Sequence, residues 1–231
     1  MRDEMREQEL ARIRETYADY ERGRIRLWDS SNRGFARIAE ERDARLIQLI
    51  RQSLPPDGRV LDAGSGVGTL AAVAKGAGIE ASWTGIDLLE SSVTLARATH
   101  PWATWIVGSA DELPFEDQAF DVIVASTLFS SLPSRRLEHG VAREIGRVVR
   151  RGGWIVWYDL RLGSPRNPAV HGLSTQDVER LFPGWPLDLE PLTLLPPVAR
   201  RLGPLTRIFY PGLSLLTPLR SHLVGRIRRP D

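Results

Sequence analysis

The sequence predicts an α/β protein with a doubly wound, mostly parallel sheet, and two observations support this fold class. First, the apolar stretch 60–63 is too short for a helix and leads through a glycine-rich turn into a helical segment from Thr69 to Lys75. Second, short apolar stretches continue to alternate with longer amphipathic segments. Strands are expected at 60–63, 82–86, 104–107, 120–125 and 154–159, and helices at 69–75, 89–99 and 137–149.

Length and composition favour one domain without a membrane span. The chain has 231 residues, enough for a single α/β domain with additions and too few for two comfortable domains. No apolar run reaches the roughly eighteen residues that a spanning helix needs. The charged stretch 1–9 lacks the apolar centre of a secretory signal, so we expect a cytoplasmic protein. The absence of cysteine excludes disulfides, thiol catalysis and cysteine zinc sites.

Positive charge gathers near the C-terminus. The net charge of +2 is too small to predict nucleic-acid binding from bulk electrostatics, so no nucleic-acid partner is expected. The local cluster is open to several interpretations: an anionic substrate, a phosphate backbone, a membrane surface or, most simply, a solvated face. The cluster consists of arginines, and the only acid near them in the sequence is Asp231. The arginines are Arg200, Arg201, Arg207, Arg220, Arg226, Arg228 and Arg229.

The glycine-rich turn narrows the class of ligand. A dinucleotide-binding G-x-G-x-x-G turn needs its third glycine at position 69, but Thr69 is there and the glycine comes one position early. This spacing disfavours an NAD-dependent oxidoreductase; an ordinary βα turn without a ligand is the other alternative. The pattern D-x-G-x-G-x-G resembles motif I of class I S-adenosylmethionine-dependent methyltransferases. By that resemblance the methionine end of the cofactor is held by Asp62, Ala63, Gly64, Ser65, Gly66 and Gly68.

An acid follows the second expected strand. Asp87 lies twenty-three residues beyond Gly64, near the offset at which an acid binds ribose hydroxyls in α/β nucleotide folds. A carboxylate suits this role because it accepts two hydroxyl hydrogen bonds at once. Leu88 is then expected to pack on the adenine. The alternative is that Asp87 only caps the following helix.

The loop after the third strand gives a further match. Residues 108–115, G-S-A-D-E-L-P-F, resemble the G-D-A-x-x-L-P-F signature of small-molecule methyltransferases, whose loop surrounds the adenine. Ser109 replaces the usual acid, so the bond to the adenine amino group falls to Ser109, Asp111 or the backbone. The cofactor-binding residues expected from this loop and from the end of the fourth strand are Ser109, Ala110, Asp111, Ala125 and Ser126.

A fourth motif completes the resemblance. Residues 143–153, R-E-I-G-R-V-V-R-R-G-G, resemble the E-x-x-R-V-L-K-P-G-G run before the fifth strand of this superfamily. Over 60–159 the chain therefore resembles type 11 methyltransferases of bacterial glycan and secondary-metabolite clusters. The resemblance implies a Rossmann-like, seven-stranded sheet with an antiparallel last strand, S-adenosylmethionine as cofactor and S-adenosylhomocysteine as product. It further implies a small-molecule acceptor, methylated on an oxygen of a sugar, polyketide or other secondary metabolite.

Two alternatives stay open for the reaction: N- or C-methylation of a small molecule, or a cofactor-binding, methyltransferase-like protein that acts on a macromolecule. The basic C-terminal region and the long N-terminal helices motivate the second. In either case we expect a monomer or homodimer without stable membrane insertion.

The parts outside the core are expected to close the site. We divide the single domain, 1–231, into a helical cap at 1–56, a cofactor-binding core at 57–160 and an acceptor-side half at 161–231. The cap has helices at 2–22 and 35–52, and the last part has strands at 187–195 and 221–228 around a helical insertion, 196–219, over the pocket mouth. The acceptor pocket is expected to include Tyr17, Tyr20, Trp28 and Phe129. For the first three, packing of the N-terminal helices onto the domain is the simpler alternative.

Methyl transfer is an in-line displacement, so positioning matters more than side-chain chemistry. An alcohol acceptor also needs a base for its proton. Asp159 and Tyr158 come at the end of the fifth strand, and His171 has the more suitable solution pKa. A hydrogen bond or salt bridge that only fixes a loop is the alternative role for each. His139 is expected on the surface, and the sequence has no convincing metal-ligand set.

Overall fold

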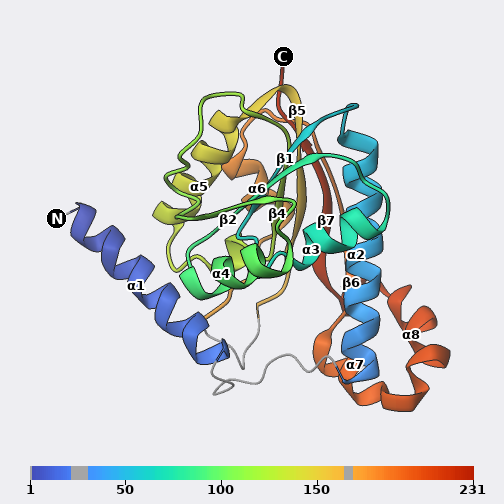
Figure 1. Cartoon of the computed structure of the whole chain (residues 1–231). Helices are drawn as coiled ribbons and strands as arrows, with labels where there is room; N and C mark the ends of the chain where they lie inside the picture. Colours follow the sequence, from blue (N-terminus) through green and yellow to red (C-terminus); the bar gives the residue numbers. More distant parts are fainter. Residues whose placement is uncertain (1, 22–30, 164–168) are drawn as a thin grey trace.

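A seven-stranded sheet forms the centre of the described molecule. The computed structural model describes residues 2–21, 31–163 and 169–231, with no account of the side chains at 2, 3 and 19–21. The strand order is β3-β2-β1-β4-β5-β7-β6 (Figure 1). The strands are β1 (Arg59–Ala63), β2 (Ser82–Asp87), β3 (Thr104–Val107), β4 (Phe120–Ser126), β5 (Val149–Leu160), β6 (Leu187–Leu194) and β7 (Arg220–Arg228).

The strand directions confirm the doubly wound, Rossmann-like fold. Strands β1 to β5 pair in parallel, and β7 runs antiparallel between β5 and β6. Strand β5 begins at Val149, five residues before the expected start, because Val149 already pairs with Phe120. The register shifts between Phe120 and Val122, where Gly152 takes a positive φ of 66°. The glycine pair therefore lies inside the strand as an irregularity.

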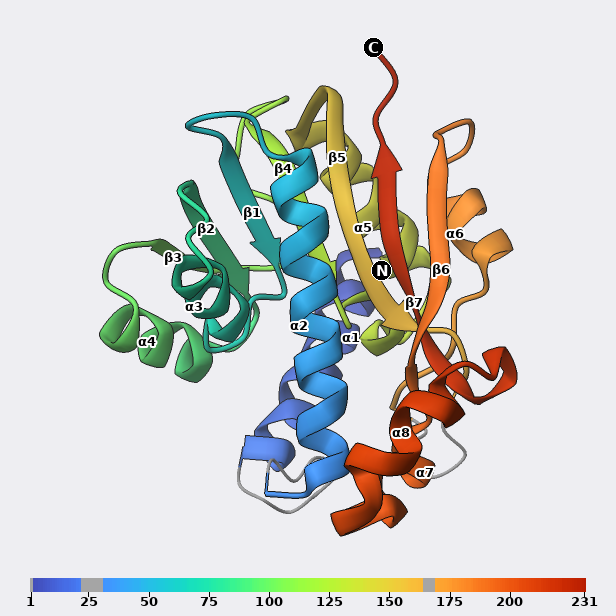
Figure 2. The same cartoon turned by 90° about the vertical axis from the view of Figure 1, so that its right-hand side faces the viewer.

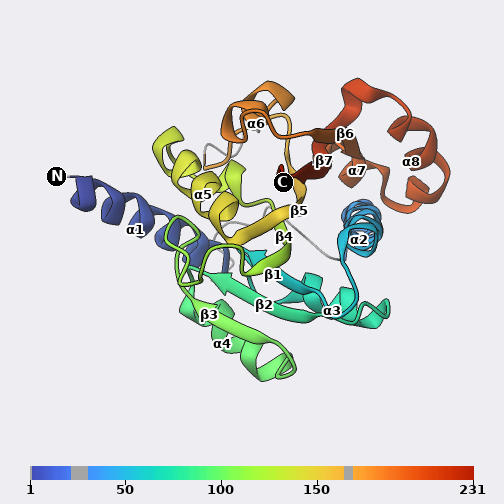
Figure 3. The same cartoon turned by 90° about the horizontal axis from the view of Figure 1, so that it is seen from above.

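Helices cover both faces of the sheet, as the view from above shows (Figure 3). Alternation along β1 and β4 sends successive apolar side chains to opposite faces. Leu61 and Ile123 join the cluster with α5 and α6, whereas Val60, Val122 and Val124 join the cluster with α2, α3 and α4. These helices are α2 (Arg33–Ser53), α3 (Thr69–Gly76), α4 (Glu90–Thr99), α5 (Arg135–Val148) and α6 (Thr175–Leu181).

The N-terminal helices have different positions. Helix α1 (Arg2–Glu21) lies along the edge where β1 to β5 end, whereas α2 runs along one face of the sheet (Figure 2). Leu46, Leu49 and Ile50 of α2 are almost fully buried in that face. The expectation that both helices cap the site is therefore wrong for α2, because its wide apolar face is used in the core.

The insertion before β7 is helical, as expected, but it packs elsewhere. It comprises α7 (Pro196–Leu202), η2 (Gly203–Leu205), α8 (Thr206–Ser214) and η3 (Thr217–Leu219). Ala199 and Tyr210 pack against Phe35 and Ile38 at the start of α2, rather than over the cavity described below. Within the described part of the chain, none of the helices is long and apolar enough to cross a membrane.

Candidate functional site

The turn between β1 and α3 is built for close approach of a ligand. Gly64, Gly66 and Gly68 all have positive φ, between 52° and 80°, which glycine adopts without a steric penalty. A Cβ on Gly68 would lie 2.5 Å from the ring of Trp105, so that position also has no room for a side chain. Gly64 and Gly66 line a cavity of about 190 Å³ at the carboxyl ends of the parallel strands. This is the edge at which α/β sheets bind ligands.

Asp87 holds this turn in place. Its Oδ2 accepts the Gly66 N–H at 2.8 Å and its Oδ1 accepts the Leu89 N–H at 2.9 Å. Leu89 is the N-cap of α4, so this bond fixes the residue that precedes the helix, but among the described residues no side chain caps the first turn of α4 itself. Asp87 also lines the cavity. Leu88 lies in the same lining. The expected placement of Asp87 and Leu88 is therefore confirmed, while their contact with a cofactor stays a prediction.

Asp62 differs from Asp87 because no described residue donates a hydrogen bond to its carboxylate. The residue is 3% exposed. Burial, and then the negative charge of Asp87, raise the pKa of Asp62 to about 7. Asp62 and Ala63 are buried in β1 and do not themselves line the cavity. Ser65 is also buried, and its Oγ has no hydrogen-bond partner.

The loop after β3 forms the next wall. Gly108, Ser109 and Ala110 line the cavity. Asp111, in contrast, is bound by Arg6 of α1: Arg6 Nε donates to its Oδ2 at 2.6 Å, and Ser109 Oγ donates to its Oδ1 at 2.5 Å. Burial alone would raise the pKa of Asp111, but these two hydrogen bonds, the positive charge of Arg6 and a backbone hydrogen bond together hold the pKa below its ordinary value. The Asp111 side chain thus fastens α1, a role that the sequence did not suggest.

The E-x-x-R motif fastens the other end of this loop. Glu144 of α5 accepts the Leu113 N–H at 3.0 Å. Arg147 donates to the carbonyl oxygens of Leu113 at 3.0 Å and Phe115 at 2.7 Å, and also binds Glu144. The two motifs recognised separately in the sequence therefore form one unit, which fixes the L-P-F part of the loop to α5.

Helix α1 covers the cavity with one face. Leu10, Ile13 and Tyr17 line it, and their spacing of three and four residues places them on the same side of the helix. The Tyr17 hydroxyl forms a hydrogen bond of 2.5 Å with Ser131 Oγ. Ion pairs from Arg6 to Asp111 and Glu112 and from Glu9 to Arg136 secure the helix. Sequence reasoning predicted the helix and Tyr17, but missed these pairs; Tyr20 and Trp28 lie outside the described side chains.

A second hollow of about 690 Å³ adjoins the first. The two share Ile13, Tyr17, Ser131 and Leu132. His171 lines this hollow, and its Nε2 lies 3.1 Å from Oε1 of the buried Glu138, which also lines it. The hydrogen bond to Glu138 raises the pKa of His171 above its ordinary value. His171 is thus the one expected base that the structure places at a cavity, and Glu138 is a partner that sequence reasoning missed.

The other two expected bases are enclosed in the fold. Asp159 is 1% exposed, and its carboxylate accepts the backbone N–H groups of Phe129, Ser130 and Leu160. Burial raises its pKa to about 6, but it lines neither cavity. Tyr158 points to the opposite face, where its hydroxyl lies 3.2 Å from Thr193 Oγ1 and burial raises its pKa. Neither side chain lines a described cavity, so the structure gives no support to a catalytic role for Asp159 or Tyr158.

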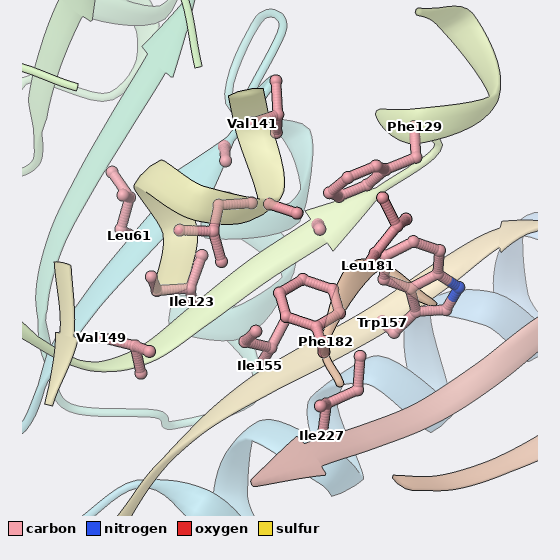
Figure 4. Close-up of a cluster of buried hydrophobic side chains, with 14 of the residues drawn as sticks. Leu61, Ile123, Phe129, Val141, Val149, Ile155, Trp157, Leu181, Phe182 and Ile227 are labelled. Atoms are coloured by element: carbon pink, nitrogen blue, oxygen red, sulfur yellow. The ribbon is translucent and has the colours of Figure 1, made fainter. Parts of the chain in front are cut away.

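Phe129 is also a core residue rather than part of an acceptor pocket. It is fully buried, and its ring centroid lies 4.7 Å from that of Trp157 (Figure 4). Ala125 is fully buried too, whereas Ser126 lines the first cavity as expected. Next to it, Thr127 lines the same cavity with a φ of 54°, which is costly for a β-branched residue.

Comparison with protein families agrees with this geometry. Residues 60–153 match a family described as a methyltransferase domain. Over these residues the chain is therefore similar to a methyltransferase domain. The matched segment extends from the start of the glycine-turn strand to the glycine pair in β5, so it includes all four motifs.

Curated methyltransferases are similar to part of this chain. A phthiotriol/phenolphthiotriol dimycocerosates methyltransferase of Mycobacterium ulcerans is 38% identical over 85 residues, which are 35% of this chain and 30% of that protein. A demethylmenaquinone methyltransferase of Thermotoga maritima is 33% identical over 116 residues, 50% of this chain and 48% of that protein. The chain thus matches less than half the length of either relative.

Solved structures share the fold over a longer stretch. The geranyl diphosphate C-methyltransferase of Streptomyces coelicolor A3(2) aligns with a TM-score of 0.66 and 14% identity, covering 84% of this chain and 82% of that one. An N-methyltransferase of Bradyrhizobium japonicum WM9 aligns with a TM-score of 0.63 and 14% identity, covering 84% and 97%. At this identity the likeness concerns the fold alone.

The residues of the matched segment fit S-adenosylmethionine as a ligand. Among the described residues no group donates a hydrogen bond to the buried Asp62 carboxylate, which suits the ammonium of the methionine part. Asp87 lies where ribose hydroxyls are expected, and apolar Ile86 and Leu88 suit the adenine. Among the described residues no group of three or more histidine, aspartate or glutamate side chains is arranged to hold a metal ion.

Proposed function

We propose that the protein transfers a methyl group from S-adenosylmethionine to a hydroxyl oxygen of a small molecule such as a sugar, a polyketide or another secondary metabolite. The single observation that carries this proposal is the His171–Glu138 pair in a hollow that adjoins the glycine-turn cavity. The names of the curated relatives support a small-molecule acceptor, since they denote methylation of lipids and quinones.

The pair assigns a role to each ring nitrogen of His171. Glu138 accepts a hydrogen bond from Nε2, which favours the tautomer with its proton on Nε2 and leaves Nδ1 as the atom that accepts a proton. Glu138 is buried and also stabilises the imidazolium that forms. His171 would thus act as a general base, and the Glu138 carboxylate would orient its ring.

The reaction then balances with groups of this chain. When bound, S-adenosylmethionine supplies an electrophilic methyl group. The acceptor oxygen forms a bond to the methyl carbon as the carbon–sulfur bond breaks, the electron pair stays on sulfur, and the hydroxyl proton passes to His171 Nδ1. The remaining task is alignment, and α1 contributes to it by covering both hollows through Ile13 and Tyr17.

The test is methyl transfer from isotopically labelled S-adenosylmethionine to a panel of hydroxylated sugars, phenols and polyketides, followed by product identification. His171→Gln should lower kcat by roughly 10²- to 10⁴-fold, the contribution typical of a general base, and leave the affinity for S-adenosylhomocysteine unchanged. His139→Gln is the matched control, because His139 is exposed on α5, one residue from Glu138. Unchanged turnover in His171→Gln, or products methylated only on nitrogen or carbon, would contradict the proposal.

A further inference from the structure

The insertion before β7 carries an apolar surface with no packing partner within the described chain. We call residues 196–219 the C-terminal lobe. Five of its large apolar side chains are about half exposed or more, and Leu215 and Ile208 reach 76% and 70%. The five are Leu205, Ile208, Phe209, Leu215 and Leu216.

This exposure does not come from loose attachment. The inward side of the lobe is anchored by Ala199 and Tyr210, both almost fully buried against the start of α2. The Tyr210 hydroxyl donates to Glu41 at 2.5 Å, and Arg220 donates to the Ser214 carbonyl at 2.5 Å. The apolar side chains therefore lie on the outer surface of a firmly held unit.

Unpaired positive charge accompanies this surface. Arg200, Arg201 and Arg207 are exposed, and no carboxylate in the described chain forms an ion pair with any of them. The sequence has no aspartate or glutamate from 191 to 230, so the lobe carries no acid that could neutralise them. Of the other arginines in the basic cluster, Arg228 pairs with Asp231, and the remaining three, Arg220, Arg226 and Arg229, are only partly exposed. The fully exposed arginines of this cluster without an ion pair in the described chain therefore lie in the lobe.

The lobe lies at the functional end of the molecule. In Figure 2 it lies at the end toward which β1, β2 and β5 point, beyond the start of α2. The glycine-turn cavity opens at the same edge of the sheet, because its walls follow the carboxyl ends of β1, β2, β3 and β4.

We propose that the C-terminal lobe docks on the surface of an anionic lipid bilayer. Large apolar side chains on a short helical unit can enter the boundary between headgroups and acyl chains, while neighbouring arginines meet anionic headgroups. A second copy of the chain fits less well, because two lobes of the same positive charge would face each other. Docking holds the carboxyl edge of the sheet, and with it the cavity, close to the bilayer.

The experiment is cosedimentation of the full chain with vesicles. One set is phosphatidylcholine alone and the other an equimolar mixture of phosphatidylcholine and phosphatidylglycerol. The protein should bind the anionic vesicles more tightly, and added salt should weaken that binding. Ile208→Ser/Phe209→Ser/Leu215→Ser should reduce the partition coefficient by roughly a hundredfold. Arg200→Gln/Arg201→Gln/Arg207→Gln should reduce it about as much, since each arginine contributes about fivefold.

Matched variants separate the lobe from the rest of the surface. Arg14→Gln/Arg143→Gln/Arg151→Gln removes the same charge from exposed sites elsewhere, and Leu95→Ser removes an exposed leucine from α4. Both should bind vesicles much more tightly than the lobe variants. Equal binding of lobe and control variants, or no binding of the unaltered chain to anionic vesicles, would overturn the proposal. So would a concentration-dependent dimer that the apolar lobe variant abolishes. Methyl transfer plays no part in this measurement, so its outcome is independent of the proposed reaction.

Discussion

Asp62 and Asp159 are two buried acids near the carboxyl ends of parallel strands, and they differ in what surrounds them. Asp62 is 3% exposed and Asp159 is 1% exposed, and burial raises the pKa values to about 7 and about 6. Asp159 accepts three backbone N–H groups, two from the turn after β4 and one from Leu160 at the end of β5. Within the described residues, Asp62 accepts none, and its nearest charged influences are Asp87 and Arg42.

The comparison teaches that burial and a raised pKa do not by themselves mark a functional acid. A hydrogen-bonded buried carboxylate stabilises the fold, whereas one without donors carries a desolvation cost that protonation or a bound cation offsets. Asp159 therefore belongs to the architecture of the loop after β4. Asp62 lies in the strand before the glycine turn, and we expect its carboxylate to meet a cationic group of the ligand.

The largest expected effect is on cofactor affinity. Asp62→Asn should weaken binding of S-adenosylhomocysteine by roughly ten- to a hundredfold, because it removes one charged hydrogen-bond partner worth about 1.5–3 kcal/mol. Isothermal titration calorimetry measures the change, and Asp188→Asn, at an exposed position in β6, is the control. Affinity in Asp62→Asn equal to that of the control would remove Asp62 from the cofactor site.

Asp159→Asn should lower the stability of the fold and leave cofactor affinity unchanged. The amide keeps only one acceptor oxygen, so at least one of the three N–H groups now faces an NH₂ group. We expect unfolding in urea to become easier by about 1–3 kcal/mol. Calorimetry on the folded variant should give unchanged S-adenosylhomocysteine affinity. Loss of affinity without loss of stability would reverse the roles that we assign to the two acids.

A smaller effect is expected at the helix that covers the site. Arg6→Ala removes the bonds to Asp111 and Glu112 and should raise amide hydrogen exchange in α1 by about fivefold, since a partly exposed charged contact is worth about 1 kcal/mol. Exchange in α2 should stay unchanged, because α2 is held by buried leucines and isoleucines. Arg14→Ala, on an exposed part of α1, should alter neither helix.

The sequence predicted the parts of the molecule that depend on local pattern. The strand–glycine turn–helix at 60–76, Asp87 and the loop 108–115 all lie where the motifs indicated. The sequence did not predict which side chains of β5 face a cavity. Because β7 and the helices on both faces of the sheet cover this strand, Tyr158 and Asp159 are both buried. The Arg6–Asp111 contact joins residues 105 positions apart, and the Glu138–His171 contact joins two elements through tertiary packing. Neither leaves a local signal.

The raised pKa of Asp62 determines how this residue changes the free energy of unfolding with pH. The unfolded chain releases this proton near the ordinary value of 3.8, whereas the folded chain holds it until about pH 7. Between these values the folded state binds more protons, so the free energy of unfolding falls as the pH rises from about 4 to about 7. Asp62→Asn should flatten that fall, as measured by urea unfolding at several pH values. A slope as steep as that of the unaltered chain would contradict the raised pKa.

Proton release on cofactor binding tests the central claim most directly. If the ammonium of S-adenosylhomocysteine meets the Asp62 carboxyl, binding lowers its pKa and expels part of a proton near pH 7. Calorimetry at that pH, in buffers of different ionisation enthalpy, measures the release. We predict a release that persists in Asp159→Asn and disappears in Asp62→Asn. The same release in Asp62→Asn as in the unaltered chain would contradict the account.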